Sequence, residues 1–156
     1  DVPAALPQLK SALRPGGLMY LTLNFDGMTA FEPALEQDEQ IITLYHRTMD
    51  ERVTAGRPAG DSRTGRKMFT WLRQAGLRIL QAGSSDWVVY PRDGRYPADE
   101  AYFLRFILSF FASALKDRAE VKEDALAAWL AARERQVERG ELVFLAHQFD
   151  FLVEAD

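Results

Sequence analysis

The turn at Pro15-Gly16-Gly17, together with the apolar run after it, constrains the fold of this chain more than any other feature. Proline cannot continue a helix and the two glycines let the backbone turn, so the helix predicted over residues 4–14 ends there. Residues 18–25 are apolar at nearly every position, which is typical of a strand covered on both faces of an α/β sheet. We therefore expect an α/β fold.

The remainder of the chain alternates between helical and extended patterns. Apolar spacing predicts the further elements: helices over 36–53, 64–75, 98–117 and 122–139, and strands over 77–90 and 142–153. Gly83-Ser84-Ser85 is expected to interrupt the first of these strands with a bulge or turn. Residues 54–64 are predicted to form a mobile loop.

Composition excludes several classes of function. Nineteen basic and twenty-three acidic residues give a net charge of -4 without a long basic block, which argues against nucleic-acid binding. Zero cysteines exclude disulfides and thiolate metal sites, and with two histidines no zinc site is expected. The apolar stretch 101–115 is too short to span a bilayer. These observations predict a cytoplasmic protein without a metal or a membrane segment.

Two short motifs carry a family resemblance. The run Leu13-Arg14-Pro15-Gly16-Gly17 before an apolar strand, followed later by Ala75-Gly76-Leu77, resembles the C-terminal half of class I S-adenosylmethionine-dependent methyltransferases. The resemblance implies a partial Rossmann-like sheet made of the family's strands five to seven. In that sheet the last strand is antiparallel and lies between the other two. Residues 1–156 would then be a single C-terminal portion of the domain, with 92–140 as a helical insertion.

The resemblance also implies what the chain does. The family binds its cofactor with a glycine-rich turn after strand one and an acidic residue at the end of strand two, and this sequence contains neither motif. The chain also starts without methionine. We therefore expect a fragment: the substrate-side portion of a methyltransferase acting on a small molecule. S-adenosylmethionine would bind the full-length parent but not this chain alone. The alternative is a non-catalytic α/β module that binds a ligand or a partner.

Asn24 and Asp26 stand where the strand over 18–25 is expected to stop. Sheets of this kind place their ligands at the carboxyl ends of the strands. Asp26 is accordingly a candidate catalytic residue that orients the nucleophile, and Asn24 a candidate substrate contact. The alternative is turn chemistry, because Asp26-Gly27 is an ordinary turn pair.

Tyr45, His46, Asp50 and Arg52 lie on or near the end of the next predicted helix. His46 and Asp50 are one helical turn apart, so the carboxylate would orient an imidazole that acts as general base. Tyr45, Asp50 and Arg52 are then candidate substrate contacts. The alternative is a solvated pair of side chains with Tyr45 in the core.

Polar residues beside Trp87 mark a weaker candidate. Ser85 and Trp87 at the expected strand interruption would suit a substrate pocket, whereas the alternative is a bulge with Trp87 in the core. His147 lies among apolar residues of the last predicted strand, and we expect a hydrogen-bonded core histidine there.

The segment from Gly60 to Lys67 superficially resembles a phosphate-binding loop. That motif requires Lys and then Ser or Thr after its second glycine, but Arg66 and Lys67 occupy these positions. A capped helix start is expected instead, with Ser62, Arg63 and Arg66 as candidate contacts for an anionic substrate.

Two surfaces predict self-association. If the chain lacks the family's strand four, residues 18–25 form an apolar edge strand with unpaired backbone groups. The helix over 98–117 is apolar around most of its circumference and must be covered on several sides. We therefore expect a dimer or larger homo-oligomer formed through one or both of these elements.

Overall fold

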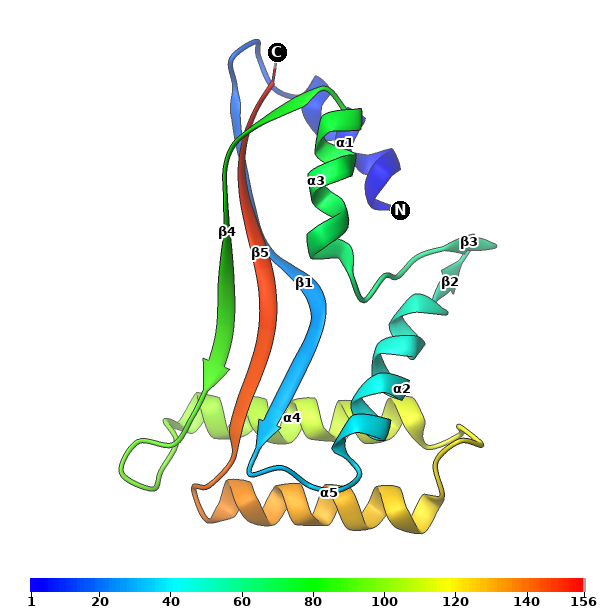
Figure 1. Cartoon of the computed structure of the whole chain (residues 1–156), viewed down its shortest axis with the longest axis vertical. Helices are drawn as coiled ribbons and strands as arrows, with labels where there is room; N and C mark the ends of the chain where they lie inside the picture. Colours follow the sequence, from blue (N-terminus) through cyan, green and yellow to red (C-terminus); the bar gives the residue numbers. More distant parts are fainter. Residues whose placement is uncertain (156) are drawn as a thin grey trace. The chain divides into compact units, whose positions relative to one another are not determined.

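The computed structural model describes residues 1–155, with the side chain of Ala98 excepted (Figure 1). The helices are α1 (Val2–Ser11), α2 (Asp38–Asp50), α3 (Thr64–Gln74), α4 (Ala98–Leu115) and α5 (Glu123–Glu138). The strands are β1 (Leu18–Glu32), β2 (Val53–Thr54), β3 (Arg57–Pro58), β4 (Leu77–Val89) and β5 (Val143–Ala155). The predicted helices and the three long strands are confirmed, and the fold is mixed α/β.

The three long strands form one sheet in the order β1-β5-β4, and β5 runs antiparallel to both neighbours (Figure 1). Next to the Pro-Gly-Gly turn, the backbone N–H of Gly16 donates to the carbonyl of Ala155 at 2.8 Å, and the N–H of Ala155 donates to Gly17 at 2.9 Å. The position predicted for the last strand, between the other two, is confirmed.

Two predictions about the strands are wrong: the end of the first strand and the interruption of the second. β1 does not stop at Phe25 but continues to Glu32, so Asn24 and Asp26 lie within the strand. β4 runs without a break through residues 83–85. In both places a local turn signal is overridden by pairing with β5, since strand formation depends more on neighbouring strands than on local propensity. Gly27 adopts a φ of 72°, which a glycine permits inside the strand.

Residues 53–58, predicted to be loop from residue 54 on and the end of a helix at residue 53, form a small hairpin of β2 and β3. Val53 pairs with Pro58 and Thr54 with Arg57 in antiparallel register. The two connecting residues, Ala55 and Gly56, have φ values of 50° and 74°. Positive φ at both central positions is the requirement of a two-residue hairpin turn.

The chain divides into two compact units. Unit 1 comprises residues 1–28, 49–86 and the described residues from His147 on. Its core lies between α1, α3 and the sheet, and its buried residues are Leu6, Met68, Leu72, Leu77, Phe151, Val153 and Ala155. Apolar residues at helical spacing place Met68 and Leu72 on the same face of α3. This packing fixes α3 on one side of the sheet.

Unit 2 comprises residues 29–48 and 87–146 and contains the helices predicted as an insertion. Its core is aromatic: the ring of Tyr45 stacks on Phe111 with centroids 3.7 Å apart, and Phe31 meets Phe111 edge to face at 5.6 Å. Arg133 is fully buried, forms an ion pair with Asp38 and donates to the carbonyl of Pro33 at 2.7 Å. Burial of a charge requires such partners.

Neither a membrane-spanning helix nor a metal-binding cluster is found among residues 1–155. None of their helices is long and apolar enough to cross a membrane. Nor do they contain a cluster of three or more His, Asp or Glu side chains able to hold a metal ion.

Candidate functional site

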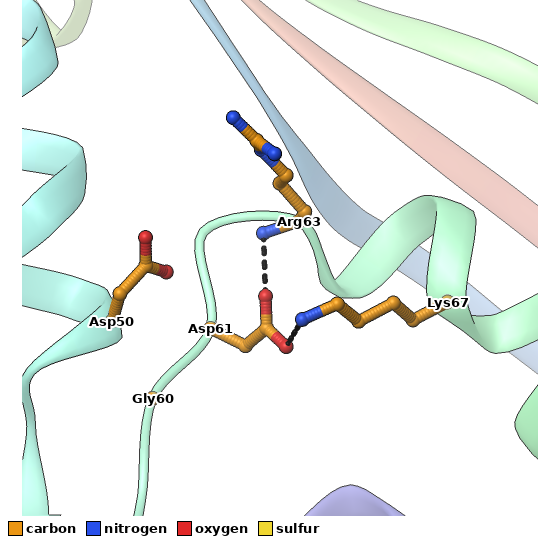
Figure 2. A pocket seen from close by; sticks show the side chains of 5 residues that line it. All are labelled: Asp50, Gly60, Asp61, Arg63 and Lys67. Atoms are coloured by element: carbon orange, nitrogen blue, oxygen red, sulfur yellow. Dashed lines mark hydrogen bonds and ion pairs between the residues drawn. The ribbon is translucent and has the colours of Figure 1, made fainter.

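A polar pocket of about 300 Å³ lies in unit 1, where the segment between β3 and α3 passes the end of α2 (Figure 2). Its lining residues come from α2, the connecting segment and the first turns of α3: Asp50, Gly60, Asp61, Arg63 and Lys67. Two carboxylates and two basic side chains therefore meet around one cavity.

The connecting segment is held firmly on the end of α2. The Asp50 carboxylate accepts a hydrogen bond from the backbone N–H of Ser62 at 2.6 Å and from its hydroxyl at 3.2 Å. Ser62 is buried. A Cβ on Gly60 would lie 2.1 Å from the carbonyl oxygen of Met49, so only glycine allows this approach. These contacts favour an ordered pocket wall rather than the mobile loop predicted from composition.

Asp61 organises the start of α3. One carboxylate oxygen accepts from the backbone N–H of Arg63 at 2.9 Å, and the other forms an ion pair with Lys67. Figure 2 shows the Arg63 guanidinium pointing away from Asp61. Within the described part of the chain, no ion pair of Arg63 is found. Arg63 therefore carries the free positive charge of the pocket.

Asp26 caps α3 from the neighbouring strand. Its buried carboxylate accepts from the backbone N–H of Arg66 at 2.7 Å and from Arg66 Nε at 2.9 and 3.0 Å. The hydrogen bond and the charge of Asp26 raise the pKa of the Arg66 guanidinium above its ordinary value. The helix start gains no capping bond from the side chain of Arg63, its own N-cap residue. The geometry therefore gives Asp26 an anchoring position inside β1.

Asn24 also holds backbone inside β1. Its Nδ2 donates to the carbonyls of Leu21 at 3.1 Å and Phe149 at 2.8 Å. Between Leu21 and Asn24, Leu23 adopts a φ of 60°, and its backbone N–H donates to an Asp150 carboxylate oxygen at 2.8 Å. A non-glycine residue with positive φ is held by its surroundings. Asn24 and Asp150 therefore stabilise a kink in the strand, and the predicted strand-end position of Asn24 is wrong.

His46 lies in unit 2, half-buried, with Nε2 3.1 Å from the Thr29 hydroxyl of β1. The tautomer of the ring decides which group donates. Tyr45 is buried in the aromatic core, as the alternative interpretation of the sequence held. The carboxylate of Asp50, predicted to orient His46, binds Ser62. Arg52 is exposed.

The residues around the predicted interruption of β4 each have different surroundings. Trp87 stacks on Phe103 with centroids 4.2 Å apart and remains 46% exposed. The Ser85 hydroxyl is buried without a hydrogen-bond partner among the described residues. His147 is half-buried, and its Nδ1 lies 2.7 Å from an Asp86 oxygen. The lining of the pocket at the end of α2 includes none of these residues.

The sequence analysis did not identify three residues that contact the candidate site residues or line the pocket: Thr29, Asp61 and Lys67. The contact of Thr29 with His46 was not predicted, because the strand was expected to end at Phe25. Asp61 and Lys67 were considered only within the rejected phosphate-loop pattern, and Asp61 binds Lys67 six residues later. A carboxylate just before a helix, with a lysine in its second turn, is a pattern that would have indicated this contact.

No protein-family model and no curated protein sequence matches the chain. Among solved structures, it is similar to the (4+2)-cyclase SpnF with 14% identity and a TM-score of 0.32. It is also similar to the cyclopropane synthase MmaA2 from Mycobacterium tuberculosis, with 11% identity and a TM-score of 0.37. The mycolic acid cyclopropane synthase CmaA1, solved in complex with SAH and CTAB, gives 11% and 0.38.

Each match covers 97% of this chain, but only 43%, 49% and 49% of the three solved structures in that order. The chain therefore spans about half the length of the structures it matches or less. These neighbours have the S-adenosylmethionine-dependent methyltransferase fold.

Proposed function

We propose that this chain is the substrate-side portion of an S-adenosylmethionine-dependent methyltransferase that acts on a small molecule. The observation that carries the proposal is the position of β5, antiparallel between β1 and β4. This strand order is what the Pro15-Gly16-Gly17 turn and the Ala75-Gly76-Leu77 step imply through their family resemblance. Helices α4 and α5 between β4 and β5 fit the implied insertion.

Among the described residues, those that line the pocket at the end of α2 do not suit the cofactor. The space beside Gly60 is occupied by backbone, because a Cβ at this position would lie 2.1 Å from the carbonyl oxygen of Met49. Gly60 therefore leaves no room for a cofactor group. The carboxylates of Asp50 and Asp61 are engaged by Ser62 and Lys67. We therefore assign the cofactor site to other parts of the parent enzyme.

His46 is our candidate for the general base. An acceptor hydroxyl or amine loses a proton when it is methylated, and a positioned imidazole suits that task. Thr29 holds the ring at 3.1 Å and so orients it. Asp26, the other candidate, has its carboxylate occupied by Arg66, which favours an anchoring role.

The first test concerns the reading frame that encodes this chain. A glycine-rich turn after a strand, within roughly a hundred residues before Asp1, is required by the proposal. Its absence from that frame would refute the methyltransferase assignment and favour the binding module. Calorimetry on the 156-residue chain should detect no micromolar binding of S-adenosylmethionine, and such binding would contradict our placement of the cofactor site.

The second test is transfer of a radiolabelled methyl group by the full-length protein to a panel of small hydroxyl and amine acceptors. His46→Gln should lower turnover by about 10²-fold or more, the usual contribution of a general base. His147→Gln is the matched control, because His147 pairs with Asp86 elsewhere. Equal turnover in both variants would remove His46 from the mechanism.

A further inference from the structure

Helix α4 has a buried face and an exposed face, and on each the residues recur every three or four positions. The inward face consists of Leu104, Leu108, Phe111 and Leu115, each at most 1% exposed. The outer face, continued by the C-cap residue Lys116, consists of exposed residues three and four positions apart: Asp99, Tyr102, Phe106, Ser109, Ser113 and Lys116. Residues at this spacing lie on one side of a helix. Tyr102 is 71% exposed and Phe106 54%.

The spacing of the outer α4 face is the same in both directions. Read from either end, the steps are 3, 4, 3, 4 and 3 residues. When two copies of α4 lie antiparallel about a twofold axis, position 99 therefore meets 116, position 102 meets 113, and position 106 meets 109. A surface that matches itself in this way is what a symmetric dimer requires.

The residues at the matched positions are complementary. Asp99 meets the partner subunit's Lys116, which places opposite charges at each end of the contact. Tyr102 meets the partner subunit's Ser113, and Phe106 meets the partner subunit's Ser109. Each large ring therefore lies opposite a small side chain, as interlocking helices need.

We propose that a second copy of this chain binds the outer α4 face, with the two α4 helices antiparallel. Charge complementarity selects this occupant and this direction, since a parallel pair would place Asp99 on Asp99 and Lys116 on Lys116. Antiparallel helix dipoles also attract. In the same arrangement Arg105 lies beside the partner subunit's Phe110, which is 44% exposed and offers a cation–π contact.

The edge of β1 is the less suitable surface. Leu18 and Tyr20 are exposed there, but Leu23 and Gly27 adopt φ values of 60° and 72°. Such kinks interrupt the flat hydrogen-bonding edge that another strand would need. The helix contact has no comparable interruption.

The chain has no cysteine, which allows a clean crosslinking test. We would prepare D99C and K116C separately and treat each alone, and then an equimolar mixture, with a short bismaleimide. Crosslinked dimer should form in the mixture and not in either variant alone, because two copies of residue 99 lie about 25 Å apart in the antiparallel pair. Crosslinking of each variant with itself would indicate parallel pairing and overturn the proposal.

Light scattering at increasing concentration provides the second measurement. The wild-type chain should be a dimer at tens of micromolar, and Phe106→Glu should weaken the dimer at least tenfold. Tyr20→Glu, which changes an exposed aromatic residue of β1, is the control and should leave the dimer unchanged. Circular dichroism would confirm that both variants fold. A wild-type monomer at 100 µM would refute the proposal and assign the outer α4 face to another occupant. A dimer weakened only by Tyr20→Glu would also refute it and would place the contact on β1.

Discussion

Replacement of Asp26 separates an anchoring role from a catalytic one. Asp26→Ala removes the acceptor for the backbone N–H of Arg66 at the start of α3, and loss of a side-chain cap costs about 1 kcal/mol. A charge-assisted bond adds to this, but the Arg66 side chain is 57% exposed and water replaces its contacts. We therefore expect Asp26→Ala to lower the free energy of unfolding by about 1–2 kcal/mol in total.

Asp26→Asn is the informative partner variant. Asparagine caps a helix about as well as aspartate, so this change should cost under about 1 kcal/mol, chiefly through the lost charge at the helix start. If Asp26 only anchors α3, the full-length Asn variant keeps its turnover. If the carboxylate takes part in the reaction, that variant folds and loses turnover.

Urea unfolding followed by circular dichroism measures both free energies. For a chain of this length, a loss of 1–2 kcal/mol corresponds to a fall of about 2–8 °C in Tm. Asp26→Ala with the stability of the wild type would refute the anchoring argument. A folded Asp26→Asn protein without turnover would restore Asp26 as a catalytic candidate.

Three further outcomes are expected. Gly60→Ala should destabilise unit 1 by about 1–3 kcal/mol in urea unfolding, because its Cβ would meet the Met49 carbonyl, whereas Gly83→Ala, with open space around it, should cost little. Burial raises the pKa of Tyr96, whose hydroxyl donates to Leu142 at 2.7 Å. The stability that it contributes is therefore present below pH about 10 and lost as the pH rises through the raised value, so Tyr96→Phe should reduce the loss of unfolding free energy between pH 9 and 12. D99K and K116D should each weaken the dimer in sedimentation equilibrium, and the double variant should restore it. If both single variants weaken the dimer and the double variant does not restore it, the charge pairing is contradicted.

The elements that the sequence predicted well are those with long, regular apolar patterns. The expected helix over 98–117 corresponds to α4, because apolar residues at helical spacing extend along its whole length. The place of β5 between β1 and β4 followed from the family resemblance, since no pattern within residues 143–155 states which strands flank them.

The site was harder to predict because its contacts join distant residues. Asp26-Gly27 has the local signature of a turn, yet the strand continues and Asp26 caps a helix that starts at Thr64. The capped helix start was therefore predicted, but its cap comes from another element. Likewise His46 was identified, and its contact Thr29 could not be, because that pairing depends on the path of β1.

The order of the sheet has a consequence for biosynthesis. β5 is the middle strand, and it follows every other helix and strand that the structure describes. While the ribosome is still making α4 and α5, β1 and β4 lack the strand that later lies between them, and the edge of each that pairs with β5 is open. Such edges invite pairing with other chains. The strand edges that later pair with β5 therefore stay open while synthesis proceeds from about residue 90 to residue 155.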